Sequence, residues 1–474
     1  MSLRRSIVIT ASAKYFEIGL GFLSSIILAR LLTPEDFGIY SIAASIALIG
    51  YMFRNFGVSQ FIIQAEKLTD EILQTSFSLT LILSWSIAAA LALASGPLGS
   101  YYGTEGLTTV FLLLSINFVL LPFGAISGAV LRRNLAFDKL AVINLSAAVV
   151  GPVVGVTSAW LDAGYLALVW ASNASTLTTV LLTLVFRPKG LPWRPGLKQV
   201  RKIFSFGLKV GLLDFVNQTG DSVSKLIIGK SHGLHDVGIY SRAYGLFMLF
   251  EYVFIEGIRQ VVLPYLSKAK RERALLGPAY LKILNFVSIF MVPSFVFLFF
   301  NASSIVHVLY GDQWTEAVAL VQVMCFAGLL LTPTIFFDQL LIAQGYPGQA
   351  LAYQTAFQVV RLGTLLALIS GSLVLTAYAV VAGAAIKALL VILLARSHFQ
   401  LKLPDLGKAV LPALLSMLAV GLGSWLATSA LLQLDNLALQ LAVSILLSGA
   451  AWLSVVMLAK HPVVDEFKRA LGRA

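Results

Sequence analysis

Apolar stretches of about 20 residues recur along the whole chain, separated by short polar turns. As a helix, each stretch is long enough to cross the hydrocarbon core of a membrane, which is roughly 30 Å thick. Of the 474 residues, 58% are hydrophobic and only 12% are charged, which excludes an ordinary soluble globular protein. The sequence therefore predicts an all-α polytopic membrane protein.

We expect about fourteen transmembrane helices joined by short loops that contain Gly and Pro. The first follows Arg4 and Arg5, and its apolar stretch is too long for a cleaved signal peptide, so we expect it to be retained. The predicted spans cover 7–32, 37–60, 72–95, 107–131, 139–161, 163–186, 203–229, 237–260, 280–300, 316–343, 350–370, 373–395, 409–431 and 437–459.

The distribution of Lys and Arg predicts the orientation. With the N-terminus inside, Arg30 and Lys230 are the only Lys or Arg residues in the outer turns, and most of the 34 fall in inner segments. This bias is typical of cytoplasmic loops, so we expect both termini in the cytoplasm. Seven cations fall within the spans: Lys14, Arg54, Lys209, Lys225, Arg242, Arg361 and Lys387.

A short motif occurs twice, 200 residues apart. Ile26–Ser41 returns as Leu226–Ser241, and Arg30 corresponds to Lys230. In both copies an apolar helix ends at a cation, and a new helix begins at Asp-x-Gly. The identical positions are Asp36, Gly38, Ile39, Tyr40 and Ser41, which match Asp236, Gly238, Ile239, Tyr240 and Ser241.

The repeat predicts two parallel six-helix lobes around a central cavity. We expect an N-terminal lobe over residues 1–200, a C-terminal lobe over 201–400, and two additional helices with a cytoplasmic tail over 401–474. Lobes of this kind rock about their cavity and expose it to one side of the membrane at a time.

Charged side chains inside the spans are expensive, so each needs a partner or an aqueous cavity. Lys14 and Glu17 are three residues apart and can pair on one helix face. In the seventh span, which also holds Lys209, four polar residues form one stripe that faces either an aqueous path or a polar seam between helices. The stripe consists of Asp214, Gln218, Asp221 and Lys225.

Several arginines are candidates for substrate contact. Arg30 ends an outer helix, where it either contacts substrate or complements the helix dipole, and Asp36 and Asp236 are expected as N-caps. Arg54 lies near the inner end of its span and either reaches the interface or projects into a cavity.

Arg242, Arg361 and Lys387 lie deeper in their spans and have no acidic neighbour at helical spacing, so they favour an anionic ligand. The remaining acids expected to be buried within the spans are Glu251, Glu256 and Asp338, which either pair with these cations or bind a coupling ion.

Patterns typical of catalysis are absent from the sequence, which predicts neither an enzyme, nor a cofactor, nor a metal site. The five histidines are scattered, and His232 and His235 alone are a weak metal signal. No GxSxG, Walker A or HExxH pattern occurs. The net charge of +12 does not indicate nucleic acid, because in a membrane protein the location of the positive charge matters more than its sum.

Ala29–Tyr40, reading ARLLTPEDFGIY, and the following Gly57-Val58-Ser59-Gln60 resemble the polysaccharide (Wzx-like) flippases of the multidrug/oligosaccharidyl-lipid/polysaccharide (MOP) exporter superfamily. The resemblance covers the whole chain and includes the second copy of the motif and the two extra helices. The related peptidoglycan-precursor flippases carry an arginine at the position of Arg30, and another before a Gly-x-x-Ser-Gln region like the one that Arg54 precedes. In this chain that region, Gly57-Val58-Ser59-Gln60, is one residue shorter. The second copy departs from the pattern at Lys230 and Leu234.

This resemblance implies a flippase that moves polyprenyl-pyrophosphate-linked oligosaccharide across the bacterial inner membrane for exopolysaccharide, capsule or O-antigen synthesis. Other expected partners are membrane lipid, a coupling proton or sodium ion, and other polysaccharide assembly proteins. The headgroup-binding candidates are Lys14, Arg30, Arg54, Lys209, Lys225, Arg242, Arg361 and Lys387, and the ion-coupling candidates are Glu17, Asp214, Asp221 and Asp338.

Two alternative functions stay open on the sequence. A multidrug or organic-cation antiporter would share the fold, although seven cations within the spans argue against a site for positive drugs. A membrane polysaccharide polymerase or glycosyltransferase would need a large outer loop, and the longest outer connection is only a turn near residues 301–315.

Overall fold

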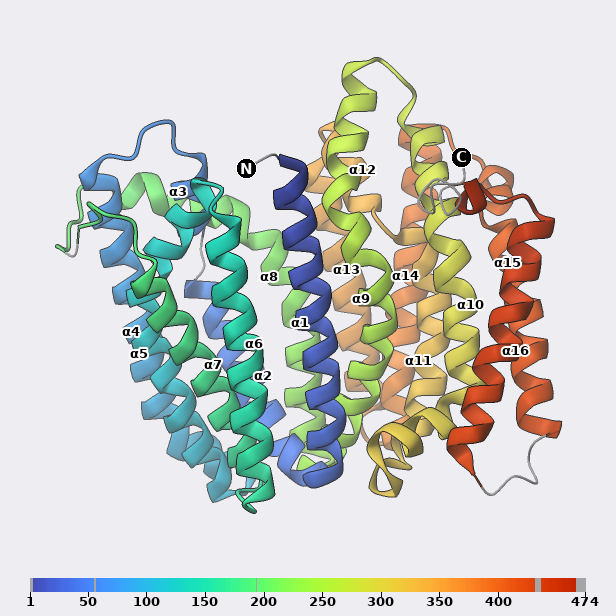
Figure 1. Cartoon of the computed structure of the whole chain (residues 1–474), viewed down its shortest axis with the longest axis horizontal. Coiled ribbons are helices and arrows are strands. Elements are labelled where there is room, and N and C mark those ends of the chain that lie inside the picture. The colour runs from blue at the N-terminus through green and yellow to red at the C-terminus, as the bar shows by residue number, and fades with distance from the viewer. Residues whose placement is uncertain (1–2, 55–56, 193, 431–435, 466–474) are drawn as a thin grey trace. The chain divides into compact units, whose positions relative to one another are not determined.

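The computed structural model of the chain consists of helices joined by short turns (Figure 1). It describes residues 3–54, 57–192, 194–430 and 436–465, and no strand occurs among them. Within these ranges, the side chains of residues 3–11, 206–214, 217, 218, 256, 257, 260 and 430 are not described. The chain packs as two compact units, Met1–Gly238 and Ile239–Ala474.

Eleven of the described helical segments are long and apolar enough to cross a membrane. This confirms an all-α polytopic membrane protein. The predicted spans 203–229, 237–260 and 350–370 coincide with helices that fall outside this set. The number of fourteen spans therefore stays a prediction.

The first unit contains eight helices and the start of a ninth. Within it, α4 packs along α5, α6 along α7, and α1 against α6, with Leu107, Phe111 and Phe118 of α5 fully buried. The bounds are α1 (Leu3–Leu31), α2 (Pro34–Arg54), α3 (Val58–Gln64), α4 (Asp70–Tyr102), α5 (Glu105–Arg133), α6 (Phe137–Trp160), α7 (Leu166–Val185), α8 (Val200–Ser231) and α9 (Leu234–Arg271).

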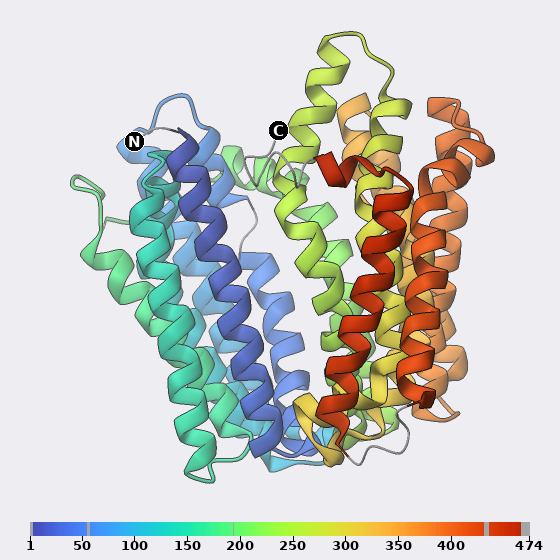
Figure 2. The same cartoon turned by 45° about the vertical axis from the view of Figure 1, so that its right-hand side comes forward.

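The second unit is built around the long helix α10, which contacts α11, α15 and α16 (Figure 2). Tyr280 and Phe295 of α10 are buried, as is Trp314 in the following turn. After the end of α9, the elements are α10 (Leu276–Tyr310), η1 (Asp312–Trp314), α11 (Ala317–Leu331), η2 (Thr332–Thr334), α12 (Phe337–Gln344), α13 (Pro347–Leu368), α14 (Leu373–Phe399), α15 (Leu403–Ala430) and α16 (Leu437–Leu458).

The two additional helices, α15 and α16, are joined to this unit by polar contacts as well as apolar ones. Ser424 of α15 and Ser448 of α16 share a hydrogen bond of 2.8 Å. The indole Nε1 of Trp452 donates to the carbonyl oxygen of Ile289 on α10, also at 2.8 Å. Small residues and hydroxyls at such crossings allow close packing where lipid removes the hydrophobic driving force.

The predicted domain boundaries at 200 and 400 stay a prediction. Helix α8, which the repeat would assign to the second half, packs against α2, α3 and α4 within the first unit. The segment before it is fixed to α4, because the Gly196 amide donates to Ser78 Oγ at 2.8 Å and Lys198 Nζ lies 2.7 Å from Glu71 Oε1.

The first copy of the repeated motif forms a capped helix start. The Thr33 amide donates to Asp36 Oδ2 at 3.0 Å, and the Asp36 amide donates to Thr33 Oγ1 at 3.2 Å. Thr33 is therefore the N-cap, Pro34 occupies the first helical position, and Asp36 closes a capping box as its third residue. The prediction of Asp36 as the N-cap was wrong by three residues.

The glycines of the two motif copies make reciprocal contacts within the first unit. A Cβ atom added at Gly38 would lie 1.8 Å from the carbonyl oxygen of Leu234, and one added at Gly238 would lie 1.8 Å from that of Pro34. The first turns of α2 and α9 thus meet backbone to backbone, which only glycine permits at these two positions.

Two predicted spans are interrupted. The span over 37–60 divides into α2 and α3 at Gly57, whose φ of 59° is left-handed. The span over 316–343 divides into α11 and α12 at Phe336, where φ is 60°. Helix breaks at membrane depth are tolerated where the freed backbone is buried in protein or lines a cavity.

Candidate functional site

A polar cavity of about 370 Å³ lies in the first unit. Seven helices, α2 to α8, and the break between α2 and α3 contribute to its wall. The residues that line it are Leu48, Tyr51, Met52, Arg54, Gly57, Val58, Ser59, Gln60, Thr80, Leu121, Gly124, Ala125, Gly128, Arg132, Leu140, Ile143, Asn144, Thr179, Val180, Thr183 and Phe215.

The local backbone explains why the cavity forms here. Helix α2 ends at Arg54, and Gly57 turns the chain so that the start of α3 also faces the cavity. On α5, the lining residues Gly124, Ala125 and Gly128 are small and recur at helical spacing. A Cβ atom added at Gly128 would approach only Arg132 Nη2, at 3.9 Å, so the missing side chain there leaves room for the cavity.

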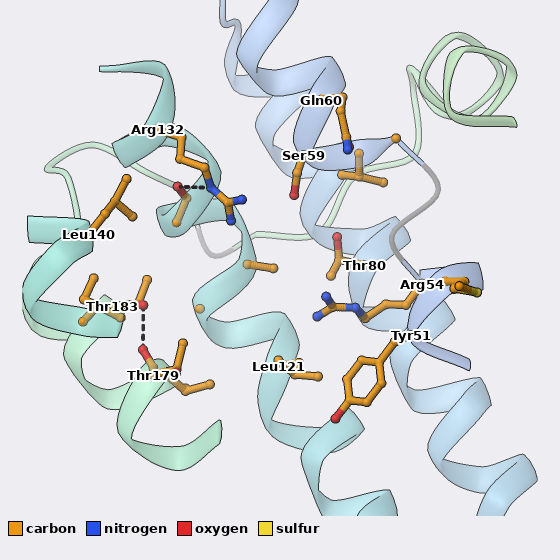
Figure 3. Close-up of a pocket in the computed structure, with 18 of the residues that line it drawn as sticks. Tyr51, Arg54, Ser59, Gln60, Thr80, Leu121, Arg132, Leu140, Thr179 and Thr183 are labelled. Carbon is orange, nitrogen blue, oxygen red and sulfur yellow. Dashed lines mark hydrogen bonds between the residues drawn. The ribbon is translucent and has the colours of Figure 1, made fainter. Parts of the chain in front are cut away.

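Two guanidinium groups dominate the electrostatics of the cavity. Figure 3 shows Arg54 and Arg132 pointing into the same space from different helices. Arg54 is partly buried beside the Tyr51 ring, with its Cζ 5.8 Å from the ring centroid. Arg132 Nε donates to the Gly128 carbonyl oxygen at 3.4 Å. Among the described residues that line the cavity, none is acidic, so the two like charges favour an anion between them.

Uncharged polar groups fill the rest of the wall. The hydroxyls of Thr80, Thr179 and Thr183 donate to carbonyl oxygens four residues back in their own helices, at 2.8, 2.9 and 2.6 Å. Because their hydrogens are engaged, these oxygens can only accept further hydrogen bonds. Ser59, Gln60 and Asn144 can supply donors. The cavity thus combines cations with groups that suit hydroxyl-rich ligands.

Of the predicted site residues whose side chains the structure describes, Arg54 alone lines this cavity. On α1, Lys14 Nζ lies 3.4 Å from Glu17 Oε2, and Arg30 ends the helix in an exposed position. On α8, Lys225 Nζ lies 2.9 Å from Asp221 Oδ2, so part of the polar stripe forms an ion pair. The side chains of Lys209, Asp214 and Gln218 lie outside the described residues.

The three deeper cations lie in the second unit, each against aromatic rings. Arg242 Cζ is 5.7 Å from the Tyr310 ring centroid, and Lys387 Nζ is 5.1 Å from that of Phe357. Arg361 is 3% exposed, donates to the Tyr240 hydroxyl at 3.3 Å and lies over Tyr244. Aromatic faces offer partial compensation for a desolvated cation.

Carboxylates also occur near one of these cations. Lys387 interacts electrostatically with Asp338 and Glu251 from two other helices. Asp338 lies in the first turn of α12, directly after the break at Phe336. The side chain of Glu256 lies outside the described residues. The assignment of substrate and ion-coupling roles to all these residues stays a prediction.

Sequence reasoning missed Arg132 and the threonines of the cavity. Arg132 was expected in an inner loop segment because it follows the last apolar turn of its span. The signal that identifies it is the spacing of four residues from Gly128, which leaves its side chain room to extend along α5 into the cavity. Thr80, Thr179 and Thr183 carry no pattern that separates them from other threonines in apolar helices.

The chain was compared with known proteins. A family model described as "Polysaccharide biosynthesis protein" matches residues 27–319. The lipopolysaccharide biosynthesis protein WzxC of Escherichia coli K12 is 26% identical over 98% of this chain and 95% of its own length. The succinoglycan biosynthesis transport protein ExoT of Rhizobium meliloti is 24% identical over 69% of this chain and 66% of its own length.

Solved structures share the fold. The lipid II flippase MurJ in an inward closed conformation aligns with a TM-score of 0.77 at 15% identity, covering 98% of this chain and all of that one. An inward-facing multidrug resistance MATE family transporter of the MOP superfamily aligns with a TM-score of 0.61 at 17% identity, covering 85% of this chain and 99% of that one.

Proposed function

Because the chain belongs to the polysaccharide biosynthesis protein family, we propose that it is a flippase for lipid-linked oligosaccharide. The substrate is an oligosaccharide joined through pyrophosphate to a polyprenyl lipid, which moves from the inner to the outer leaflet of the bacterial cytoplasmic membrane. The relatives named for lipopolysaccharide and succinoglycan synthesis support this substrate class.

The observation that supports this function best is the pair of arginines in one polar cavity. Planar guanidinium groups bind phosphate oxygens in a bidentate manner, and two of them match the two phosphates of a pyrophosphate. Arg54 and Arg132 line the cavity with no carboxylate beside them among its described lining residues. A headgroup anion would neutralise this charge, whereas an organic cation would add to it.

The threonine oxygens extend the proposal to the sugar. Free hydroxyls of an oligosaccharide are donors, and the acceptors of Thr80, Thr179 and Thr183 suit them. In this mechanism the pyrophosphate binds between the arginines, the first sugar lies along the threonines, and the polyprenyl chain stays in the lipid.

The proposed orientation follows from the Lys and Arg bias, which favours cytoplasmic termini. Arg54 and Arg132 then lie towards the cytoplasmic ends of their helices, where the substrate is made. Translocation needs no covalent step, because rocking of two repeats about the bound headgroup exposes it to the other side.

Energy input is also part of the proposal. A proton or sodium gradient resets the transporter, with Glu17, Asp214, Asp221 and Asp338 as coupling candidates, and other polysaccharide assembly proteins receive the product. Lys14, Arg30, Lys209, Lys225, Arg242, Arg361 and Lys387 remain candidates for contact with the headgroup at other stages of the cycle.

The test compares lipid-linked intermediates in a deletion strain complemented with variants. Without the protein, we expect surface polymer to be lost and complete repeat units to accumulate on the cytoplasmic leaflet. R54Q and R132Q should each lower transport at limiting substrate by about tenfold, because each removes hydrogen bonds between charged groups. Arg194 is exposed and lines no part of the cavity, so R194Q is the matched control.

Two results would contradict the proposal. Complete repeat units on the outer leaflet of the deletion strain would place the block at polymerisation. An unchanged lipid-linked pool, accompanied by altered drug susceptibility, would indicate the organic-cation exporter.

A further inference from the structure

A second and larger cavity, of about 1070 Å³, lies in the second unit. It shares no lining residue with the cavity around Arg54 and Arg132. Its walls are largely apolar and come from α9, α10 and α15. Its lining residues include Ile258 and Val261 of α9, Ile283 and Phe286 of α10, and Ala409 of α15. We refer to it as the α9–α10–α15 groove.

Two lysines lie at one end of this groove. Lys282 is in the second turn of α10 and Lys408 in the second turn of α15, and both are exposed. In the part of the chain that the structure describes, neither ammonium group makes a hydrogen bond or an ion pair. The groove also contains Asp405, whose Oδ2 accepts a hydrogen bond from the Lys402 amide at 3.0 Å. Two cations against one engaged carboxylate leave this end positive.

The walls of the groove are held together by specific contacts. Asn285 Nδ2 of α10 donates to the Ala409 carbonyl oxygen of α15 at 2.7 Å. The segment after α16 folds against α10, where Val463 is 1% exposed and Pro462 lines the groove. The α9–α10 turn, the start of α15 and the end of α16 lie at the same end of this unit (Figure 1). The groove is therefore preformed.

The shape and charge of the groove define its ligand. An occupant must be apolar along most of its length and must carry an anion at one end. Basic pockets between transmembrane helices on the cytoplasmic side are typical sites for anionic lipid headgroups. We propose that the α9–α10–α15 groove binds an anionic glycerophospholipid, with its phosphate between Lys282 and Lys408 and an acyl chain along Ile258, Val261 and Phe286.

This site goes beyond the proposed transport function, because the lipid is a bound partner rather than cargo. Only its placement in the cytoplasmic leaflet depends on the proposed orientation. An anionic lipid held by α9, α10 and α15 ties α15, the first of the two additional helices, to the rest of the second unit.

The test is native mass spectrometry of the full-length protein, purified in detergent and titrated with phosphatidylglycerol or with phosphatidylcholine of the same chain length. We expect phosphatidylglycerol to be retained in preference to phosphatidylcholine. K282Q and K408Q should each weaken retention by about fivefold, and the double variant by about thirtyfold, since each basic side chain near the membrane surface contributes similarly.

Matched variants separate the groove from general surface charge. Lys268 is also exposed, near the end of α9, and pairs with Glu272, so K268Q should retain lipid like the parent protein. Val261 lines the groove and is 62% exposed, so V261W should occupy the acyl-chain position without disturbing a packed core and should reduce retention.

Four outcomes would overturn the proposal. They are equal retention of the two lipids, full retention by the double lysine variant, full retention by V261W, and displacement of phosphatidylglycerol by an equimolar amount of polyprenyl phosphate. The last would assign the groove to the transported lipid. The transport assay on R54Q is unaffected by any of these outcomes, so the two proposals fail independently.

Discussion

The reciprocal glycine contact between α2 and α9 allows a quantitative prediction. In G38A the new Cβ would lie 1.8 Å from the Leu234 carbonyl oxygen, whereas tight contacts of a real Cβ begin near 3.0 Å. The two helix starts must therefore separate by about 1.2 Å. The obstacle is backbone, which cannot rotate away as a side chain can.

The expected cost follows from two opposing effects. Overpacking costs about 1–3 kcal/mol, and we take the upper value because backbone is displaced. Replacing glycine by alanine within a helix recovers about 1 kcal/mol. The net prediction for G38A is a free energy of unfolding about 2 kcal/mol lower, and the same holds for G238A because its contact with Pro34 has the same 1.8 Å geometry.

The double variant makes the prediction specific. Moving the two helix starts apart relieves both clashes, so G38A/G238A should cost little more than either single variant. If the two sites were independent, the losses in free energy of unfolding would add to about 4 kcal/mol. We therefore expect a coupling energy of about 1–2 kcal/mol in a double-mutant cycle.

The assay is reversible unfolding of the detergent-purified protein, followed by the fluorescence of its seven tryptophans. The matched control is G245A on α9, where nothing lies within 4 Å of the added Cβ. It should leave stability unchanged or raise it slightly. If G38A behaves like G245A, or if the two single costs simply add, the reciprocal contact does not govern the stability of this junction.

Three further predictions address single residues. Asn436 caps α16 by accepting hydrogen bonds from the Ala438 and Leu439 amides at 3.0 and 3.2 Å. In the same unfolding assay, N436A should lower the free energy of unfolding by about 1 kcal/mol, whereas N436D should keep most of the stability of the parent protein. Arg133 donates to the carbonyl oxygens of Ile62, Ile63 and Glu66, so R133Q should speed hydrogen exchange of the α3 amides without changing α4. Burial lowers the pKa of His461, which is 2% exposed. As pH falls through about 6.5, the unfolded chain takes up a proton that the folded chain does not, so the free energy of unfolding should decrease below that pH. Equal pH profiles for H461Q and the parent protein would contradict this.

Interactions along one helix could be predicted from spacing. Lys14 and Glu17 were expected to pair because residues three apart share a helix face, and they do. The same rule accounts for Asp221 and Lys225. Apolar length also predicted the helical membrane fold, because hydrocarbon thickness allows few other solutions.

Interactions between helices could not be predicted in this way. Arg361 has no acidic neighbour at helical spacing, and its hydrogen-bond partner Tyr240 lies 121 residues earlier in the chain, where spacing along one helix cannot identify it. The break at Phe336 was also missed, because a non-glycine residue with positive φ carries no reliable sequence signal. Cavity lining was one of two alternatives that the sequence left open for Arg54, and Arg54 does line the cavity. Arg132 required knowledge of where α5 ends.

The position in the chain of the cavity around Arg54 and Arg132 has a consequence for biosynthesis. Every residue that lines it precedes residue 216, and all belong to the unit that ends at Gly238. Compact units generally fold in the order in which the ribosome supplies them. The cationic cavity can therefore assemble while the second half of the chain is still being translated. Substitutions of its arginines, or of the glycines of α5, would then expose the partly synthesised chain to cleavage by membrane proteases.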